Sequence, residues 1–157
     1  MQTTVVKEEL APRLRLAVTR MARRLRQEAG ADLGPSQAAA LATIERHGPI
    51  SPSELADLER IKRPTATRIV RHLQGPGLIQ RVKDPEDGRA SILSITSEGR
   101  DLLRRLRARK TAYLAKRLDA LDAEDRKTLE RAAERRSQIT PESASQCGFG
   151  LLRAKPR

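Results

Sequence analysis

The chain has 157 residues, the length of one domain with a hydrophobic core of its own. Its formal net charge of +12 predicts a polyanionic partner. The single cysteine, Cys147, excludes an internal disulfide, and the near absence of aromatic residues argues against the base-stacking surfaces of single-strand binding proteins.

We expect the protein to act in the cytoplasm and not in a membrane. The N-terminal residues MQTTVVKEEL lack the apolar segment of a signal peptide, and no apolar run reaches about 18 residues. The sequence contains no His/Cys cluster with zinc spacing, no glycine-rich phosphate loop and no nucleophile-elbow serine. We therefore expect no enzyme, no metal and no cofactor.

The first predicted helix runs from about Lys7 to Glu28 and ends at Gly30. A second helix begins at Gly34-Pro35 and stops at His47-Gly48-Pro49. The inward-facing residues of the second helix are Leu41 and Ile44. The first helix has an apolar stripe formed by Leu10, Leu14, Ala17, Val18, Met21 and Leu25.

Two shorter helices follow. Ser51 can cap the third helix while Glu54 reaches back to it, and Leu55 and Leu58 face inward. The fourth helix begins at Pro64. Its apolar residues, at the spacing of one helical face, are Ala66, Ile69, Val70 and Leu73. Its outer face carries Thr65, Arg68, Arg71 and His72.

Two short strands, Leu78–Lys83 and Ser91–Ile95, flank a turn that contains Asp-Gly. Thr96 then caps a long helix, and Asp122 begins a last one. The long helix keeps one leucine-rich stripe, which predicts a partner helix from a second copy. From Ser137 the pattern loses all periodicity and predicts an irregular or disordered tail.

The region from Arg60 to Lys83 contains seven Lys or Arg and no acidic residue. A short helix that is basic outside and apolar inside, packed on another short helix, is helix-turn-helix geometry. Arg68 and Arg71 could then pair with guanine, and Thr65 could contact a thymine methyl group. The predicted DNA contacts from this helix are Arg63, Pro64, Thr65, Thr67, Arg68, Arg71 and His72.

The start of the fourth helix lacks a good capping side chain, since Arg63 and Pro64 occupy it. Either its free N–H groups bind a DNA phosphate, or water or an upstream carbonyl satisfies them.

The turn between the strands offers a similar choice. Arg89 could enter the minor groove while Asp87 holds a neighbouring arginine and Asp84 braces the turn, or the turn could be a solvated surface ion pair. Beside a basic helix we favour the first hypothesis and add Lys83, Asp87 and Arg89 to the predicted contacts.

The stretch from about Leu33 to Leu103 resembles the MarR family of winged helix-turn-helix repressors. The matching segments, in the family's order and spacing, are LGPSQ (33–37), SPSELA (51–56), RPTATR (63–68), GLI (77–79), DPEDGR (84–89) and LSITSEG (93–99). The resemblance implies a mainly α fold with a small β-hairpin wing, in which the winged helix-turn-helix is flanked by N- and C-terminal dimerisation helices. It also implies a homodimer, a palindromic operator and, in many members, release by a small molecule or an oxidant.

We therefore expect residues 1–30 and 101–136 to dimerise, residues 31–100 to bind double-stranded DNA and residues 137–157 to form the tail. The residues that we expect to line an effector pocket are Leu16, Arg20, Met21 and His47. Cys147 lies far from the N-terminal helix, where redox-sensing relatives carry their reactive cysteine, and no basic neighbour would lower its pKa. The alternative function is a non-specific, nucleoid-type DNA-binding protein.

Overall fold

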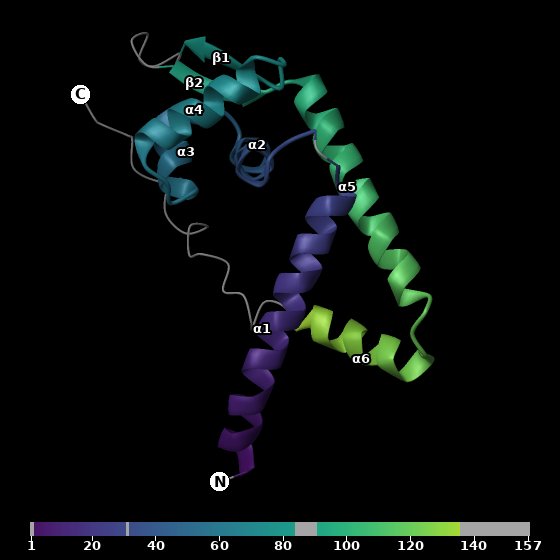
Figure 1. The fold of residues 1–157 in the computed structure, drawn as a ribbon. Helices are drawn as coiled ribbons and strands as arrows, with labels where there is room; N and C mark the ends of the chain where they lie inside the picture. Colours follow the sequence, from purple (N-terminus) through teal and green to yellow (C-terminus); the bar gives the residue numbers. More distant parts are fainter. Residues whose placement is uncertain (1, 31, 84–90, 136–157) are drawn as a thin grey trace, which may run out of the picture. The chain divides into compact units, whose positions relative to one another are not determined.

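The computed structural model describes residues 2–30, 32–83 and 91–135, and within these ranges it contains six helices and one two-stranded antiparallel sheet (Figure 1). This is the mainly helical, winged architecture that the sequence predicts. The chain forms two compact units, one ending at Leu114 and the other starting at Ala115. The elements are α1 (Gln2–Glu28), α2 (Pro35–His47), α3 (Pro52–Leu58), α4 (Arg63–Gln74), β1 (Ile79–Lys83), β2 (Ser91–Ile95), α5 (Ser97–Leu118) and α6 (Ala123–Glu134).

Glycines and side-chain caps set the helix ends at the predicted places. Gly30 follows α1 with a φ of 89°, and Gly48 follows α2 with a φ of 76°, both in the left-handed region that favours glycine. Ser51 begins α3 through a capping box. Its Oγ accepts from the Glu54 N–H at 3.2 Å, and the Glu54 carboxylate accepts from the Ser51 N–H at 2.7 Å.

The core of the larger unit is aliphatic and lies among α2, α3, α4, the hairpin and the first turns of α5. Leu41 and Leu73 are completely buried, and each such leucine contributes about 1.5–3 kcal/mol. The prediction for α3 is wrong at one position. Leu58 is 37% exposed, because Leu55 and its neighbour Ala56 already fill the contact with α2 and α4. The buried residues of α4 are those predicted: Ala66, Ile69, Val70 and Leu73.

The hairpin is attached to the helices through a third backbone segment. β1 and β2 pair so that Ile79 faces Ile95. Ile50, in the loop before α3, exchanges two backbone hydrogen bonds with Leu93 of β2, at 3.1 and 2.7 Å. These bonds hold the wing against the helix-turn-helix.

Thr96 joins the hairpin to α5. Its Oγ1 donates to the Gly77 carbonyl at 2.7 Å and accepts from the Gly99 N–H at 3.1 Å, which confirms the predicted cap. Gly99 lies so close to the end of the hairpin that a Cβ there would be 2.2 Å from the Leu78 carbonyl oxygen. A glycine is therefore needed for α5 to approach the wing.

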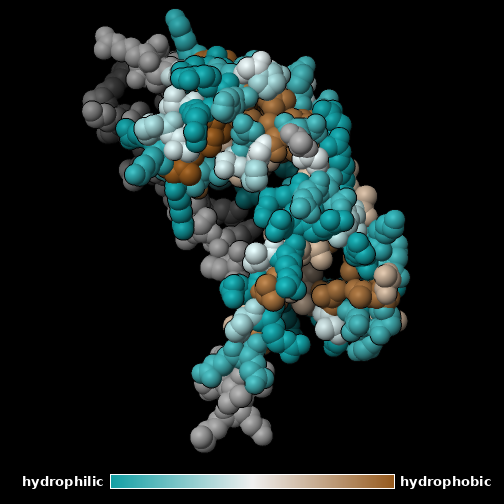
Figure 2. Space-filling view, viewed as in Figure 1, coloured by the Kyte–Doolittle hydropathy of each residue, from teal (hydrophilic) through white to brown (hydrophobic). Residues whose placement is uncertain are grey.

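The long N-terminal helix begins earlier than predicted, at Gln2 instead of about Lys7. Pro12 lies inside it, and the helix continues on both sides of this missing N–H. Within the described chain, the α1 stripe is largely uncovered, with Val18 58% and Leu14 49% exposed. No described residue of α6 is buried, and Figure 2 shows apolar surface on this helix. None of the described helices combines the length and the apolar character that a membrane-spanning segment requires.

Candidate nucleic-acid interface

A compact turn joins α3 to α4. The Arg60 N–H donates to the Asp57 carbonyl at 3.1 Å, and the Ile61 N–H donates to the Ala56 carbonyl at 2.9 Å. Arg60 takes a left-handed backbone with a φ of 52°, which lets the chain reverse within a few residues. Two short helices joined in this way, with the second held by its apolar face, form a helix-turn-helix.

The outer face of α4 is open to solvent. Arg68 and Arg71 are exposed, and their spacing of three residues puts them on one side of the helix. Thr65 is half-buried at the edge of that side, and the Thr67 hydroxyl donates to the Arg63 carbonyl at 3.0 Å. Of the predicted DNA contacts in α4, the exposed residues are Arg63, Pro64, Thr67, Arg68, Arg71 and His72.

The start of α4 has no side-chain cap, as predicted, but a backbone carbonyl accepts hydrogen bonds from N–H groups of its first turn. The Lys62 carbonyl accepts from the Thr65 N–H at 2.9 Å and from the Ala66 N–H at 3.1 Å. Pro64 has no N–H. The upstream-carbonyl alternative therefore holds for Thr65, and the Arg63 N–H is what remains in the first turn to meet a phosphate.

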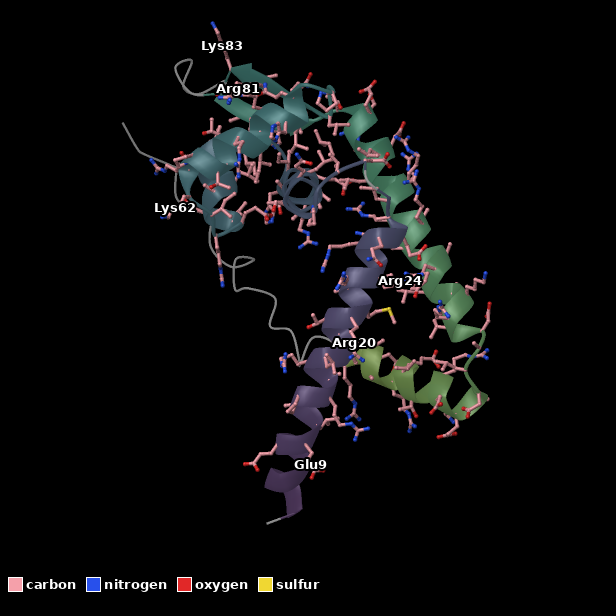
Figure 3. All side chains as sticks on the ribbon, viewed as in Figure 1. Glu9, Arg20, Arg24, Lys62, Arg81 and Lys83 are labelled. Carbon is pink, nitrogen blue, oxygen red and sulfur yellow. The ribbon has the colours of Figure 1, made fainter. Side chains whose placement is uncertain are left out.

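The wing extends the basic surface beyond α4. Arg81 and Lys83 are exposed on β1, and Figure 3 shows both at the wing, with Lys62 in the loop before α4. The turn after β1 lies outside the described residues, and with it the predicted contacts Asp87 and Arg89.

These side chains form what we call the cationic surface. Within the described chain, none of its members forms an ion pair with a carboxylate, although carboxylates are near in sequence. Glu54 serves the α3 cap, and Glu59 accepts a hydrogen bond from the Thr43 hydroxyl. The charges are therefore available to phosphates. The members of the cationic surface are Arg60, Lys62, Arg63, Arg68, Arg71, Arg81 and Lys83.

Three of these cations were not among the predicted DNA contacts. Arg81 stands two residues before Lys83 in the same strand, so the period of two residues puts both side chains on one face of the hairpin. That signal was present in the sequence. Arg60 and Lys62 precede α4, and their exposure follows from a turn that only the fold defines.

A cavity of about 690 Å³ lies between the end of α1, the start of α2 and α5. Leu33, Ala38 and Leu103 contribute apolar wall, while Arg26 and Arg107 contribute positive charge. The cavity gives no support to the predicted effector residues, because none of them lines it: Leu16, Arg20, Met21 and His47 are all exposed elsewhere.

Comparison with known proteins gives consistent results. The MarR family matches residues 33–91. An uncharacterised HTH-type transcriptional regulator of Mycobacterium bovis is 34% identical over 135 residues, covering 85% of this chain and 94% of its own. A crystal structure of a transcriptional regulator protein from Pseudomonas aeruginosa is 35% identical with a TM-score of 0.76, covering 85% of this chain and 94% of its own. A mutant of MepR from S. aureus, bound to an oligodeoxyribonucleotide, shares the fold at 18% identity with a TM-score of 0.67, covering 83% of this chain and 98% of its own.

A helix-turn-helix with a basic outer helix, followed directly by a hairpin wing, defines the winged helix-turn-helix class of DNA-binding proteins. The chain belongs to the MarR family of HTH-type transcriptional regulators. It is accordingly a DNA-binding regulator of transcription and not an enzyme. Among the described residues, there is also no cluster of His, Cys, Asp and Glu that could hold a metal ion.

Proposed function

We propose that the protein is a homodimeric, sequence-specific regulator that represses transcription by occupying a palindromic operator. The observation that carries this proposal is the cationic surface, whose charges have no carboxylate partner within the described chain. The apolar side of α4 is buried in the core, so the base-reading groups on its outer side would be held in place before DNA arrives. A protein that covers both half-sites would exclude others from that stretch of DNA.

Each part of the cationic surface would have its own task. α4 would enter the major groove, where Arg68 and Arg71 would meet base edges. Arg81 and Lys83 would contact phosphates beside it and fix the register. Arg89 would probe the minor groove, held by Asp87, as we expect from the sequence.

Dimerisation would use residues 1–30 and 101–136, leaving residues 31–100 to bind DNA. The apolar stripe of α1 supports this assignment, because an uncovered stripe of large side chains is a common mark of an interface. α6 offers further apolar surface through Leu129, which is 48% exposed. Two-fold symmetry would then place the reading helices roughly 34–36 Å apart, one turn of DNA.

A small-molecule effector would bind in the cavity between α1, α2 and α5. Its size lies in the range of about 300–1,000 Å³ that is typical of ligand sites. Its apolar walls and its positive charge suit a compact molecule with an apolar body and an anionic group. Binding of the effector would affect the ion pair between Arg107 and Glu45 of α2, because Arg107 lines the cavity.

The proposal is tested by selecting bound genomic fragments with the purified protein and measuring affinity for the recovered site and for a shuffled duplex. We expect a preference of about 10³-fold or more for the recovered site. Both affinities should fall with salt, with a slope near −0.9 per phosphate contact. Equal affinity for the two duplexes would instead establish the nucleoid-type alternative.

A further inference from the structure

A single arginine fastens the end of α1 to α5. Arg109 Nη1 donates to the Ala29 carbonyl oxygen and to the Asp32 carboxylate, both at 2.8 Å. Ala29 closes the last turn of α1, through a hydrogen bond from its N–H to the Leu25 carbonyl, and Asp32 lies in the junction that leads to α2. One guanidinium group of α5 therefore holds both sides of the α1–α2 junction.

The glycine between these two acceptors makes room for the guanidinium. Gly30 has a φ of 89°, and a Cβ built on it would lie 2.7 Å from Arg109 Nη1. Glycine places little restraint on its own backbone, so the direction of the chain at this bend depends on the contacts around it. Arg109 supplies two of them.

A second contact joins the same part of α1 to α5, and we call the Arg109 contacts and this one together the α1–α5 seam. The Arg24 guanidinium lies 5.9 Å from the centre of the Tyr113 ring, within the range of a cation–π interaction. From Arg24 to Ala29 the contacts move five residues toward the C-terminus of α1. Their partners, Tyr113 and Arg109, move four residues toward the N-terminus of α5, as expected for antiparallel helices. Figure 1 shows the end of α1 beside α5, and Figure 3 shows Arg24 on this part of α1.

The α1–α5 seam connects the proposed dimer helix to the DNA-binding lobe. The first turns of α5 belong to the lobe, because Leu102, Leu103 and Leu106 are buried in its core. α1 carries the exposed apolar stripe. The angle at which α1 leaves the lobe would therefore set the distance and rotation between the two lobes of a dimer. A change of one base pair moves a half-site by roughly 3.4 Å and rotates it by about 36°.

We propose that Arg109 is a positioning residue for DNA recognition, which fixes the half-site spacing that the dimer accepts. The proposal rests on the proposed function as a two-fold operator-binding dimer. Arg109 and Asp32 are 46% and 45% exposed, so their ion pair adds little stability by itself. The ion pair instead fixes the direction of α1. A variant that lacks it should therefore stay folded but lose part of its preference for one half-site spacing.

The chain offers a matched control on the same helix. Arg104 pairs with Asp101 at 3.0 Å, but both residues belong to α5, so this ion pair connects no two elements. Arg109→Gln and Arg104→Gln each remove one positive charge and one ion pair from α5. Asp32→Asn weakens the same clamp from the other side and serves as the second test variant should Arg109→Gln not fold.

The experiment measures the affinity of the full-length protein for duplexes carrying the selected half-sites at the selected spacing, at spacings changed by one and two base pairs, and as a single half-site. For the unmodified protein and for Arg104→Gln, we expect a preference for the selected spacing of at least about tenfold. For Arg109→Gln, we expect this preference to fall below about threefold, with single-half-site affinity unchanged and a melting temperature within about 3 °C.

Two results would overturn the inference without touching the proposed function. In one, Arg109→Gln keeps the spacing preference of the unmodified protein. In the other, it loses affinity equally on every duplex, single half-sites included, which would mean a general structural role. The proposed function itself fails if the unmodified protein is a monomer or shows no preference for the selected site, and that result appears before any variant is compared.

Discussion

The side chains that would read bases lie on the outer side of α4, and the opposite side of this helix is buried in the core. Arg68 and Arg71 extend from α4 into solvent, while Leu73 on the opposite side is completely buried. An arginine placed in this way does not have to leave an ion pair in order to bind guanine, so little of its binding free energy is lost to rearrangement.

Replacing these arginines should therefore damage specificity more than general affinity. Arg68→Ala or Arg71→Ala should weaken binding to the operator by about 1–3 kcal/mol and to a shuffled duplex much less, as measured by fluorescence anisotropy at fixed salt. Arg105→Ala, at an exposed position of α5, controls for the loss of one charge. Equal losses on both duplexes would show that the α4 arginines contact phosphates only.

The carboxylate of Glu98 predicts a small pH dependence of stability. Hydrogen bonds from its own backbone N–H and from the Ser97 hydroxyl, at 3.0 Å, lower its pKa below the ordinary value of 4.5. A lowered pKa in the folded state means stability that is present above about pH 4.5 and lost as the pH falls through the folded value.

Urea denaturation of Glu98→Gln checks this. The variant should unfold at a lower urea concentration than the unmodified protein at pH 7, and the difference should narrow as the pH falls below 4.5. Glu130→Gln, on the exposed surface of α6, controls for the loss of one negative charge. A gap at pH 3 as wide as at pH 7 would contradict the assignment.

At the scale of elements, the contact between the hairpin and α5 depends on one missing side chain. Gly99→Ala would put a Cβ 2.2 Å from the Leu78 carbonyl oxygen, a backbone atom that cannot turn aside. We expect a loss of about 3 kcal/mol in the free energy of unfolding. Gly75→Ala is the matched control, because its backbone is helical and its Cβ would make an ordinary contact of 3.6 Å. It should be neutral or slightly stabilising, and a similar loss in both variants would refute the explanation.

The elements themselves were largely predictable, because their signals are local. The Ser51–Glu54 cap, the glycine ends of α1 and α2 and the apolar face of α4 are all written within a few residues. The contacts between elements were not predictable in this way. The pairing of Ile50 with Leu93 and of Arg109 with Asp32 joins residues far apart in sequence, and neither residue type nor period marks them beforehand.

The candidate site divides along the same line. The outer face of α4 follows from helical periodicity, and the structure places its predicted members there. The cavity is assembled from α1, α2 and α5, so no single segment carries its pattern, and the residues predicted from the sequence to line an effector pocket are not among those that line this cavity.

At the scale of the whole molecule, the apolar stripe of α1 should hold two copies together. Leu14→Glu places a charge in the middle of the stripe and should convert a dimer to a monomer, as measured by sedimentation velocity, because an unpaired charge in an apolar interface is costly. Leu16→Glu is the control, since Leu16 is similarly exposed, at 44%, but points away from the stripe. Dissociation by both variants, or by neither, would count against this interface.

The composition of the core has a practical consequence for spectroscopy. The chain contains no tryptophan and a single tyrosine, and Tyr113 lies in the α1–α5 seam beneath Arg24, outside the aliphatic core. Intrinsic tyrosine fluorescence will therefore not report on the packing of the DNA-binding lobe and will report on the α1–α5 seam alone. A change in tyrosine emission on adding an operator duplex, after correction for light absorbed by the duplex, would show that the surroundings of Tyr113 change on DNA binding, while the fold around α4 is followed separately by circular dichroism.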